Sequence, residues 1–246
     1  MTKPLSQPPI VGIWQHFPLP MVSRYLGLMG WDWVILDMQH SAANTETAYE
    51  CLHTLHAAGT TPLLRTSVGV PSEVQRALDL GARGVVVPMV NSVEQARQAV
   101  AAMKFPPLGI RSSGGGRCTV YGSDYFNWAN DEVAVIVQIE HIEAVRHARE
   151  ILSVPGVDAG YIGPNDLAVS MGLPPDGFVT HPDHAAAVAE VLKAAKEVGV
   201  PIGIHTYSVE HTIMRVQQGF QFVACGSEAG FMRQAAAAAL KQLVRE

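Results

Sequence analysis

The sequence predicts a single (β/α)8 barrel, in which eight parallel strands alternate with helices. Short, almost continuously apolar runs alternate along the chain with longer segments of helical spacing, which is the first observation. The second is the length, because 246 residues suit one barrel of this kind. The third is the composition: 48% of the residues are apolar and 16% are charged, which excludes a globally disordered chain. We therefore expect residues 1–246 to form one TIM-barrel domain.

Eight segments are predicted as strands because apolar residues fill them almost completely, as in parallel strands that are covered on both faces. In chain order they are Ile10–Trp14, Trp33–Asp37, Pro62–Arg65, Gly84–Pro88, Val133–Glu140, Ala159–Gly163, Pro201–Ile204 and Phe222–Gly226. A doubly wound Rossmann sheet is the alternative. It requires a glycine fingerprint between its first strand and first helix, and the stretch Gly12–Gln15 contains none.

The intervening segments are predicted as helices from their spacing and composition. They are Thr45–Ala58, Ser72–Leu80, Ser92–Met103, Ile142–Leu152, Ala185–Val198, Val209–Gln218 and Ala229–Val244. Several begin at a capping residue, such as Asn44 or Ser92, and several end at a glycine, such as Gly199 or Gly219. The segment Gly109–Trp128 is expected to be irregular and to loop over one end of the barrel.

Charge and cysteine content exclude several classes of protein. The net charge of −5 and the lack of a basic cluster argue against a nucleic-acid or membrane surface. No apolar run approaches the roughly 18 residues that span a bilayer, and Met1–Pro9 lacks the apolar stretch of a signal peptide. Cys51, Cys118 and Cys225 are odd in number and lack CxxC spacing, so no disulfide framework or zinc site is expected. We expect a cytoplasmic enzyme-sized domain.

Polar residues recur where the predicted strands end. In a TIM barrel the active site lies at these carboxyl ends, where the loops from strand to helix gather. Polar groups are costly to bury without partners, so their repetition at one end of separate strands indicates a shared site. The strand ends carry Asp37–His40, Arg65, Gln138–Glu140, Gly163–Asp166 and His205.

Glu140 and Asp166 each end an apolar strand, and the two strands are neighbours. Two carboxylates that leave positions open for water and substrate suit Mg²⁺, Mn²⁺ or a similar divalent cation. Asp166 taken alone is better explained as the cap of a short following helix. For the pair, a metal site is the favoured interpretation.

Four further residues have a functional and a purely structural interpretation. Asp37 near His40 has two interpretations. Its carboxylate fixes the tautomer of an imidazole that acts as acid and base, or Asp37 forms an Asx turn beside an ordinary surface histidine. Arg65 suits an anionic substrate oxygen, or a buried ion pair with Asp37 or Glu140. Gln138 lies two residues before Glu140, so both side chains face the barrel interior. There the Gln138 amide suits a carbonyl or enolate oxygen of a substrate, or an interior amide whose hydrogen bonds are satisfied by the protein.

Other catalytic arrangements find little support. The glycines Gly114–Gly116, with Arg111 and Arg117, resemble a phosphate cradle only weakly, and we expect a mobile lid or a subunit-contact loop there. No GxSxG nucleophile elbow is present, and no lysine lies at a strand end for a Schiff base.

Taken together, these segments resemble the HpcH/HpaI family of class II, metal-dependent pyruvate aldolases. The resemblance extends with similar spacing from about Ile10 to the last helix, and the motifs are specific in combination. The matching stretches are Trp31–His40, Leu64–Arg65, Gly81–Val90, Phe105–Arg111, Val137–Glu140 and Ile162–Leu167.

The resemblance implies a pyruvate-type TIM barrel that cleaves or forms 4-hydroxy-2-oxo acids through a pyruvate or hydroxypyruvate enolate and an aldehyde. It implies Mg²⁺, Mn²⁺ or Co²⁺ as cofactor, with Glu140 and Asp166 as ligands. It also implies a homo-oligomer, either a hexamer built as a trimer of dimers or a trimer, in which the last helix packs on a neighbouring subunit.

The resemblance also assigns roles to the other residues. Arg65 would hold the pyruvyl oxygen and stabilise the enolate, and His40, oriented by Asp37, would be the acid/base group acting through water. The backbone near Gly163–Asn165 would bind the pyruvyl carboxylate. The residues implied in substrate binding are Gln138, Gly163, Pro164, Asn165 and Trp14.

The chain departs from the family pattern at Gln39, where many members have Glu, at Ser112 and Ser113, and at His205, where small or apolar residues are common. These departures leave the metal and enolate residues intact and leave the aldehyde open. Two alternatives therefore remain: an oxaloacetate decarboxylase or related pyruvate-enolate lyase using the same site, and a non-catalytic metabolite-binding oligomer.

Overall fold

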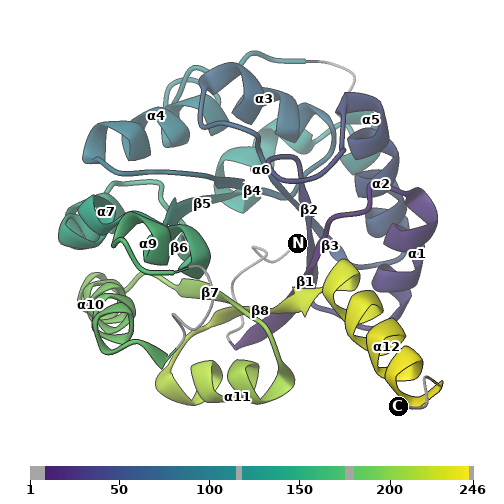
Figure 1. The fold of residues 1–246 in the computed structure, drawn as a ribbon. Coiled ribbons are helices and arrows are strands. Elements are labelled where there is room, and N and C mark those ends of the chain that lie inside the picture. Colours follow the sequence, from purple (N-terminus) through teal and green to yellow (C-terminus); the bar gives the residue numbers. More distant parts are fainter. Residues whose placement is uncertain (1–8, 115–117, 175–179, 244–246) are drawn as a thin grey trace.

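The computed structural model of the chain describes residues 9–114, 118–174 and 180–243. Its eight strands form a closed parallel barrel in which each strand pairs with the next and the last pairs with the first (Figure 1). The strands are β1 (Ile10–Gln15), β2 (Trp33–Asp37), β3 (Thr61–Arg65), β4 (Gly84–Val87), β5 (Ala134–Ile139), β6 (Ala159–Ile162), β7 (Ile202–Thr206) and β8 (Phe222–Ser227). The predicted TIM barrel is confirmed, and every predicted strand matches an observed one within two residues at each end.

Helices surround the barrel and cover the outer faces of the strands (Figure 1). They are α1 (Pro20–Leu28), α2 (Thr45–Ala57), α3 (Pro71–Asp79), α4 (Val93–Met103), α5 (Cys118–Tyr121), α6 (Tyr125–Glu132), α7 (Ile142–Arg146), α8 (Ala148–Leu152), α9 (Pro164–Ser170), α10 (Pro182–Val198), α11 (Val209–Gln218) and α12 (Glu228–Leu243). The side chains of Asn44 and Ser92 accept hydrogen bonds from the first turns of α2 and α4, as expected. Gly199 and Gly219 end α10 and α11 in the left-handed conformation, also as expected.

Large aromatic side chains fill the barrel interior. Trp33 on β2 and Phe222 on β8 are fully buried, with ring centroids 4.3 Å apart. Gly12 on β1 makes room for them, because a Cβ atom there would lie 2.1 Å from the Trp33 ring. Beneath the carboxyl ends of the strands, the barrel interior is therefore a packed core.

Several predicted helices differ from the observed ones. The single helix predicted over Ile142–Leu152 is two short helices, α7 and α8, which meet at His147. The helix α1 was not predicted. The short helix expected after Asp166 is α9, which begins at Pro164, so Asp166 lies in its first turn and is not its cap. The predicted last helix, Ala229–Val244, is α12, and Val244 lies outside the described residues.

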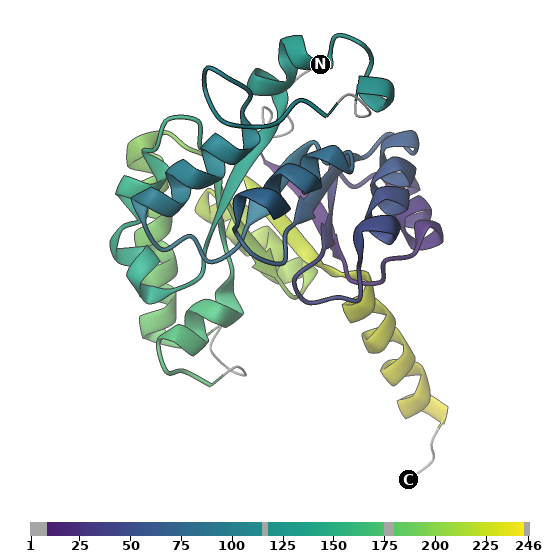
Figure 2. The ribbon, with the colours of Figure 1, turned by 90° about the horizontal axis from the view of Figure 1, so that it is seen from above.

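The segment Gly109–Trp128 does not cover the strand ends that carry the predicted site. It precedes β5 and lies at the opposite end of the barrel, where Tyr121 donates a hydrogen bond to the carbonyl of Gly81, just before β4 (Figure 2). Part of it is helical, in α5 and α6. Arg111 contacts Asp79 at 3.3 Å. Gly115, Gly116 and Arg117, where a lid or a subunit contact was expected, lie outside the described residues.

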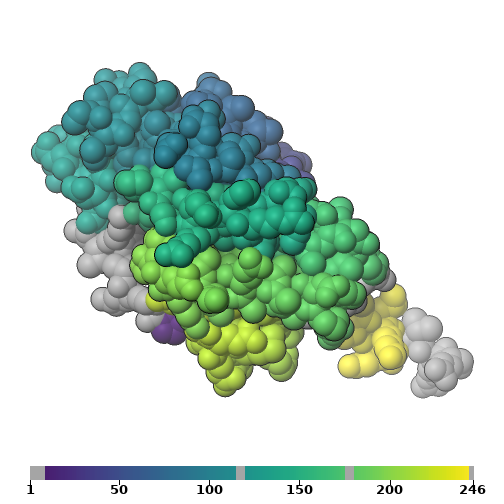
Figure 3. All heavy atoms as spheres, turned by 90° about the vertical axis from the view of Figure 1, so that its left-hand side faces the viewer, coloured from purple at the N-terminus to yellow at the C-terminus, as the bar shows by residue number. Residues whose placement is uncertain are grey.

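The last helix stands apart from the barrel. α12 has no buried residue and protrudes beyond the body of the molecule (Figures 2 and 3). Among the helices of the described ranges, none is long and apolar enough to cross a membrane.

Candidate active site

One small cavity opens at the carboxyl ends of the strands. Its volume is about 250 Å³. The lining residues come from β1, β3, β5, β6, β7 and the loops that follow the strands. They are Trp14, His16, His40, Arg65, Gln138, Tyr161, Gly163, Pro164, Asn165, Asp166, His205 and Tyr207. The cavity therefore brings together most of the residues that the sequence analysis placed in the site.

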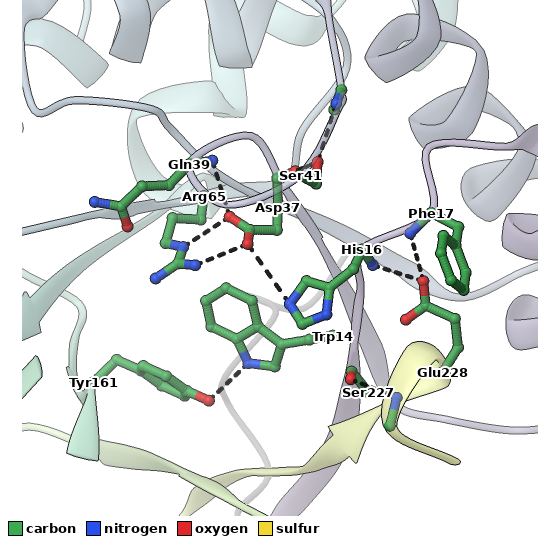
Figure 4. Close-up of polar contacts among 12 residues, drawn as sticks. Trp14, His16, Phe17, Asp37, Gln39, Ser41, Arg65, Tyr161, Ser227 and Glu228 are labelled. Carbon is green, nitrogen blue, oxygen red and sulfur yellow. Dashed lines mark hydrogen bonds and ion pairs between the residues drawn. The ribbon is translucent and has the colours of Figure 1, made fainter. Parts of the chain in front are cut away.

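Arg65 and Asp37 form a buried bidentate pair at the ends of β3 and β2 (Figure 4). The Arg65 Nε and Nη2 groups donate to the two Asp37 carboxylate oxygens at 2.9 and 2.8 Å. The guanidinium also lies over the Trp14 ring, 4.4 Å from its centroid. The structural interpretation of Arg65 as an ion-pair partner of Asp37 is thus confirmed. The Nη1 group makes no hydrogen bond within the described chain, so it remains available to a ligand in the cavity.

The carboxylate of Asp37 does not contact His40 within the described chain. Its oxygens face Arg65, the backbone N–H of Gln39 at 2.9 Å, and His16, whose Nε2 lies 3.6 Å away. Burial favours a raised pKa for Asp37, but the hydrogen bonds and charge of Arg65, the Gln39 N–H and His16 together hold the pKa below its ordinary value. His40 lines the cavity as an exposed side chain. The imidazole that faces Asp37 is therefore that of His16.

Glu140 is held in place from both sides. Its Oε1 accepts the backbone N–H of Met89 at 2.9 Å, and its Oε2 accepts the amide of Gln138. Met89 has a positive φ of 55°, unusual for a non-glycine residue, and this conformation presents its N–H to the carboxylate. Gly163 packs against the same group, since a Cβ atom there would lie 2.4 Å from Glu140 Oε2.

The electrostatics of Glu140 suit a cation. Burial and the nearby Asp166 charge together raise the pKa of Glu140 to about 7, against the opposing effects of the Met89 hydrogen bond and the Arg65 charge. Asp166 is exposed to the cavity and accepts no hydrogen bond within the described chain. The Asp166 carboxylate is exposed, and the ionised Glu140 carboxylate is destabilised by its burial. A divalent cation between these two neighbouring groups would neutralise both charges. No group of three or more potential ligands occurs in the described ranges, so water or substrate would complete such a site.

The loop after β6 offers fewer backbone donors than expected. The N–H of Gly163 donates to the Ile139 carbonyl at 3.3 Å, and Pro164 has no N–H. The open donors are the N–H groups of Asn165 and Asp166 in the first turn of α9, which lack partners within the helix. The Asn165 side chain accepts a hydrogen bond from the Tyr207 hydroxyl at 2.6 Å.

Three residues that line the cavity were not found from the sequence: His16, Tyr161 and Tyr207. The sequence analysis named His205 as a strand-end residue but gave it no role. Tyr161 accepts the indole N–H of Trp14 at 2.8 Å. Glu228 at the start of α12 fixes the loop that carries His16, because its Oε1 accepts the backbone N–H groups of His16 and Phe17, both at 2.6 Å (Figure 4). The available signal was position alone: His16 and Tyr207 follow predicted strands, and Tyr161 lies within one.

A TIM barrel whose strand ends gather an arginine, two carboxylates and several imidazoles around one small cavity defines an enzyme for a small polar molecule. The chain belongs to the HpcH/HpaI aldolase/citrate lyase family, whose sequence model matches residues 11–235. The family predicted from the sequence motifs is therefore confirmed.

Individual relatives cover nearly the whole chain. A 2-dehydro-3,6-dideoxy-6-sulfogluconate aldolase of Pseudomonas putida is 36% identical over 94% of this chain and 91% of its own length. A hydroxypyruvate/pyruvate aldolase of Sagittula stellata is 36% identical over 93% of this chain and 90% of its own length. The crystal structure of an HpcH/HpaI aldolase/citrate lyase family protein from Burkholderia cenocepacia superposes with a TM-score of 0.89 at 31% identity, covering 96% of this chain and 95% of that one.

Proposed function

We propose that the chain is a divalent-metal-dependent aldolase that cleaves and forms 4-hydroxy-2-oxo acids, with pyruvate or hydroxypyruvate as the oxo-acid product. One observation supports this most directly: Arg65 and Asp166 line the same cavity, and the buried Glu140 carboxylate lies close enough to both to interact with their charges. The aldolase names of the curated relatives agree with it.

Glu140 and Asp166 would hold the cation, either Mg²⁺, Mn²⁺ or Co²⁺. When bound, such a cation supplies Lewis-acid polarisation of an oxo acid. Gln138 fixes the Glu140 carboxylate and lines the same space. The open N–H groups of Asn165 and Asp166 are donors of the kind that a substrate carboxylate accepts.

Arg65 stabilises the negative charge that develops on the C2 oxygen when the C3–C4 bond breaks. The electron pair of the C3–C4 bond remains on C3 and is delocalised onto the C2 carbonyl oxygen, which forms the enolate. His40 takes the proton of the C4 hydroxyl group. The aldehyde then leaves, and the enolate is protonated at C3. Trp14 holds the Arg65 guanidinium from one face and Asp37 holds it from its edge.

Chelation is expected to abolish pyruvate release from 4-hydroxy-2-oxo acids, because the two carboxylates alone repel the anionic substrate. Pyruvate release is measured on untreated protein, after EDTA, and after addition of Mg²⁺, Mn²⁺ or Co²⁺. Full activity in EDTA contradicts the metal role. Release of pyruvate from oxaloacetate alone identifies a decarboxylase instead, and no ligand binding or turnover with any cation identifies a non-catalytic oligomer.

We also propose that the protein is a homo-oligomer, a hexamer or a trimer, in which α12 packs on a second copy. Leu240 and Leu243 on α12 are 62% and 79% exposed, and Met21 and Leu28 on α1 are also exposed. Phe231, near the start of α12, is the residue that packs on the barrel of its own chain. Apolar exposure over two helices is large for a monomer.

The double substitution Leu240→Asp with Leu243→Asp is expected to shift the protein to smaller species, because charges replace the apolar contacts of α12. Light scattering after size-exclusion chromatography measures the mass. Gln242→Asp is the control, since it adds a charge to the same turn without removing an apolar side chain. An unchanged mass in the double variant rules out α12 as an interface.

A further inference from the structure

The side chain of His205 faces the cavity from the end of β7. Along β7, Ile202 and Ile204 belong to the core between strands and helices, whereas a Cβ atom at Gly203 would meet the interior rings of Phe222 and Tyr161. Side chains alternate along a strand, so His205 points inward like Gly203, one step closer to the carboxyl end. It lines the cavity together with Trp14 and Arg65.

Aromatic neighbours fix the His205 ring. It meets Trp14 edge-on, with centroids 5.8 Å apart, and meets Tyr207 edge-on at 5.0 Å. The polar atoms of these neighbours are directed elsewhere, because the Trp14 indole donates to Tyr161 and the Tyr207 hydroxyl donates to Asn165. No hydrogen bond to the His205 ring exists within the described ranges, so its two nitrogens are left for a ligand.

The His205 imidazole is uncharged near neutral pH. Burial, which has the largest effect, and the charges of His16 and Arg65 together lower its pKa to about 3, outweighing the opposing effect of Asp37. A neutral imidazole carries one N–H donor and one nitrogen acceptor. A hydroxyl group is both acceptor and donor and therefore satisfies both, whereas an anionic group accepts only.

We propose that His205 recognises a hydroxyl group of the substrate and so selects hydroxylated reactants over their deoxy analogues. The proposal rests on the proposed aldolase function and refines it by naming the substrate class. The hydroxyl group can belong to either reactant of the aldol addition: C3 of a hydroxypyruvate donor, or C2 of a 2-hydroxyaldehyde acceptor. An analogue that lacks the hydroxyl group leaves the donor and the acceptor of the His205 ring without partners, which disfavours its binding and turnover.

Two matched pairs of substrates test the proposal and distinguish the two sources of the hydroxyl group. Hydroxypyruvate and pyruvate are compared as donors with one acceptor, and glycolaldehyde and acetaldehyde are compared as acceptors with one donor. His205→Leu is expected to lower the ratio of kcat/KM for the hydroxylated over the deoxy member by about tenfold in one pair. The affected pair shows which reactant carries the hydroxyl group.

His205→Gln keeps a hydrogen-bond donor and an acceptor and is expected to restore part of that ratio. If His205 only filled space, His205→Gln would not restore the ratio. His147→Leu makes the same replacement at an exposed histidine between α7 and α8 and is expected to leave both ratios unchanged. Thermal melting of each variant verifies folding.

Deuterium exchange at C3 of pyruvate, measured in the same preparations with Mn²⁺, separates this proposal from the proposed function. If the wild type exchanges and His205→Leu changes neither ratio, or lowers both members of each pair equally, hydroxyl recognition by His205 is wrong while the aldolase function stands. A wild type that neither exchanges nor cleaves overturns both.

Discussion

Replacement of Arg65 by alanine is expected to lower kcat/KM for aldol cleavage by on the order of 10²–10³-fold or more, the usual effect of losing a transition-state charge partner. The Nη1 group of Arg65 is the cationic donor left open to the cavity, since Nε and Nη2 are bonded to Asp37. Steady-state pyruvate release by the Arg65→Ala variant in saturating Mn²⁺ measures the effect.

The same substitution also affects folding, and this must be separated from catalysis. Asp37 is fully buried, so removing its cationic partner leaves an uncompensated charge at a cost of about 3–5 kcal/mol. The double variant Arg65→Ala with Asp37→Asn removes that charge and is expected to recover stability without recovering activity. Arg83→Ala is the matched control, because Arg83 is buried at the opposite end of the barrel near Glu132 and Trp128. A folded double variant with near-normal turnover would exclude Arg65 from the reaction.

The barrel and the position of its site follow from local sequence patterns. A strand covered on both faces must be apolar throughout, so Trp33–Asp37 is predicted with the same bounds that the structure shows. A polar residue that ends such a run, such as Asp37 or Arg65, must find a partner or a ligand. This reasoning places both residues at the carboxyl ends of β2 and β3 without knowledge of their contacts.

The helix α1 is not predicted from the sequence because its apolar residues lie on both its exposed and its buried sides. Met21, Tyr25 and Leu28 are exposed, whereas Ser23 and Gly27 are buried. Periodicity finds a helix from an apolar stripe that faces the core. On α1, Leu26 is buried as well, so the apolar residues do not form one stripe and the rule gives no clear signal.

Contacts between residues that are distant in the sequence were not predicted either. The sequence suggests His40 as the partner of Asp37 because it is three residues away, but the carboxylate faces Arg65 and His16 from other strands. Likewise, nothing local indicates that His205 on β7 meets Trp14 on β1, since closure of the barrel alone brings them into one cavity.

Glu140→Gln is expected to lower the affinity for Mn²⁺, and with it kcat/KM at fixed Mn²⁺, by at least about 100-fold. The substitution removes one of the two carboxylates without changing the shape of the side chain. The hydrogen bonds of this side chain are kept. The new amide oxygen accepts the Met89 N–H. Gln138 Oε1 is a buried atom without a partner in the wild type, and it accepts the new amino group once the Gln138 amide rotates by half a turn. Calorimetric titration with Mn²⁺ measures the affinity.

The melting temperature without metal distinguishes this loss of function from misfolding. Burial and the neighbouring Asp166 charge both raise the pKa of Glu140, so its ionised form destabilises the metal-free protein. At pH 8, Glu140→Gln is therefore expected to melt at the same temperature as the metal-free wild type or above it, while added Mn²⁺ raises the melting temperature of the wild type alone. Glu132→Gln, at the opposite end of the barrel, is expected to keep both the Mn²⁺ response and the activity. Unchanged Mn²⁺ affinity in Glu140→Gln would show that the cation binds without this carboxylate.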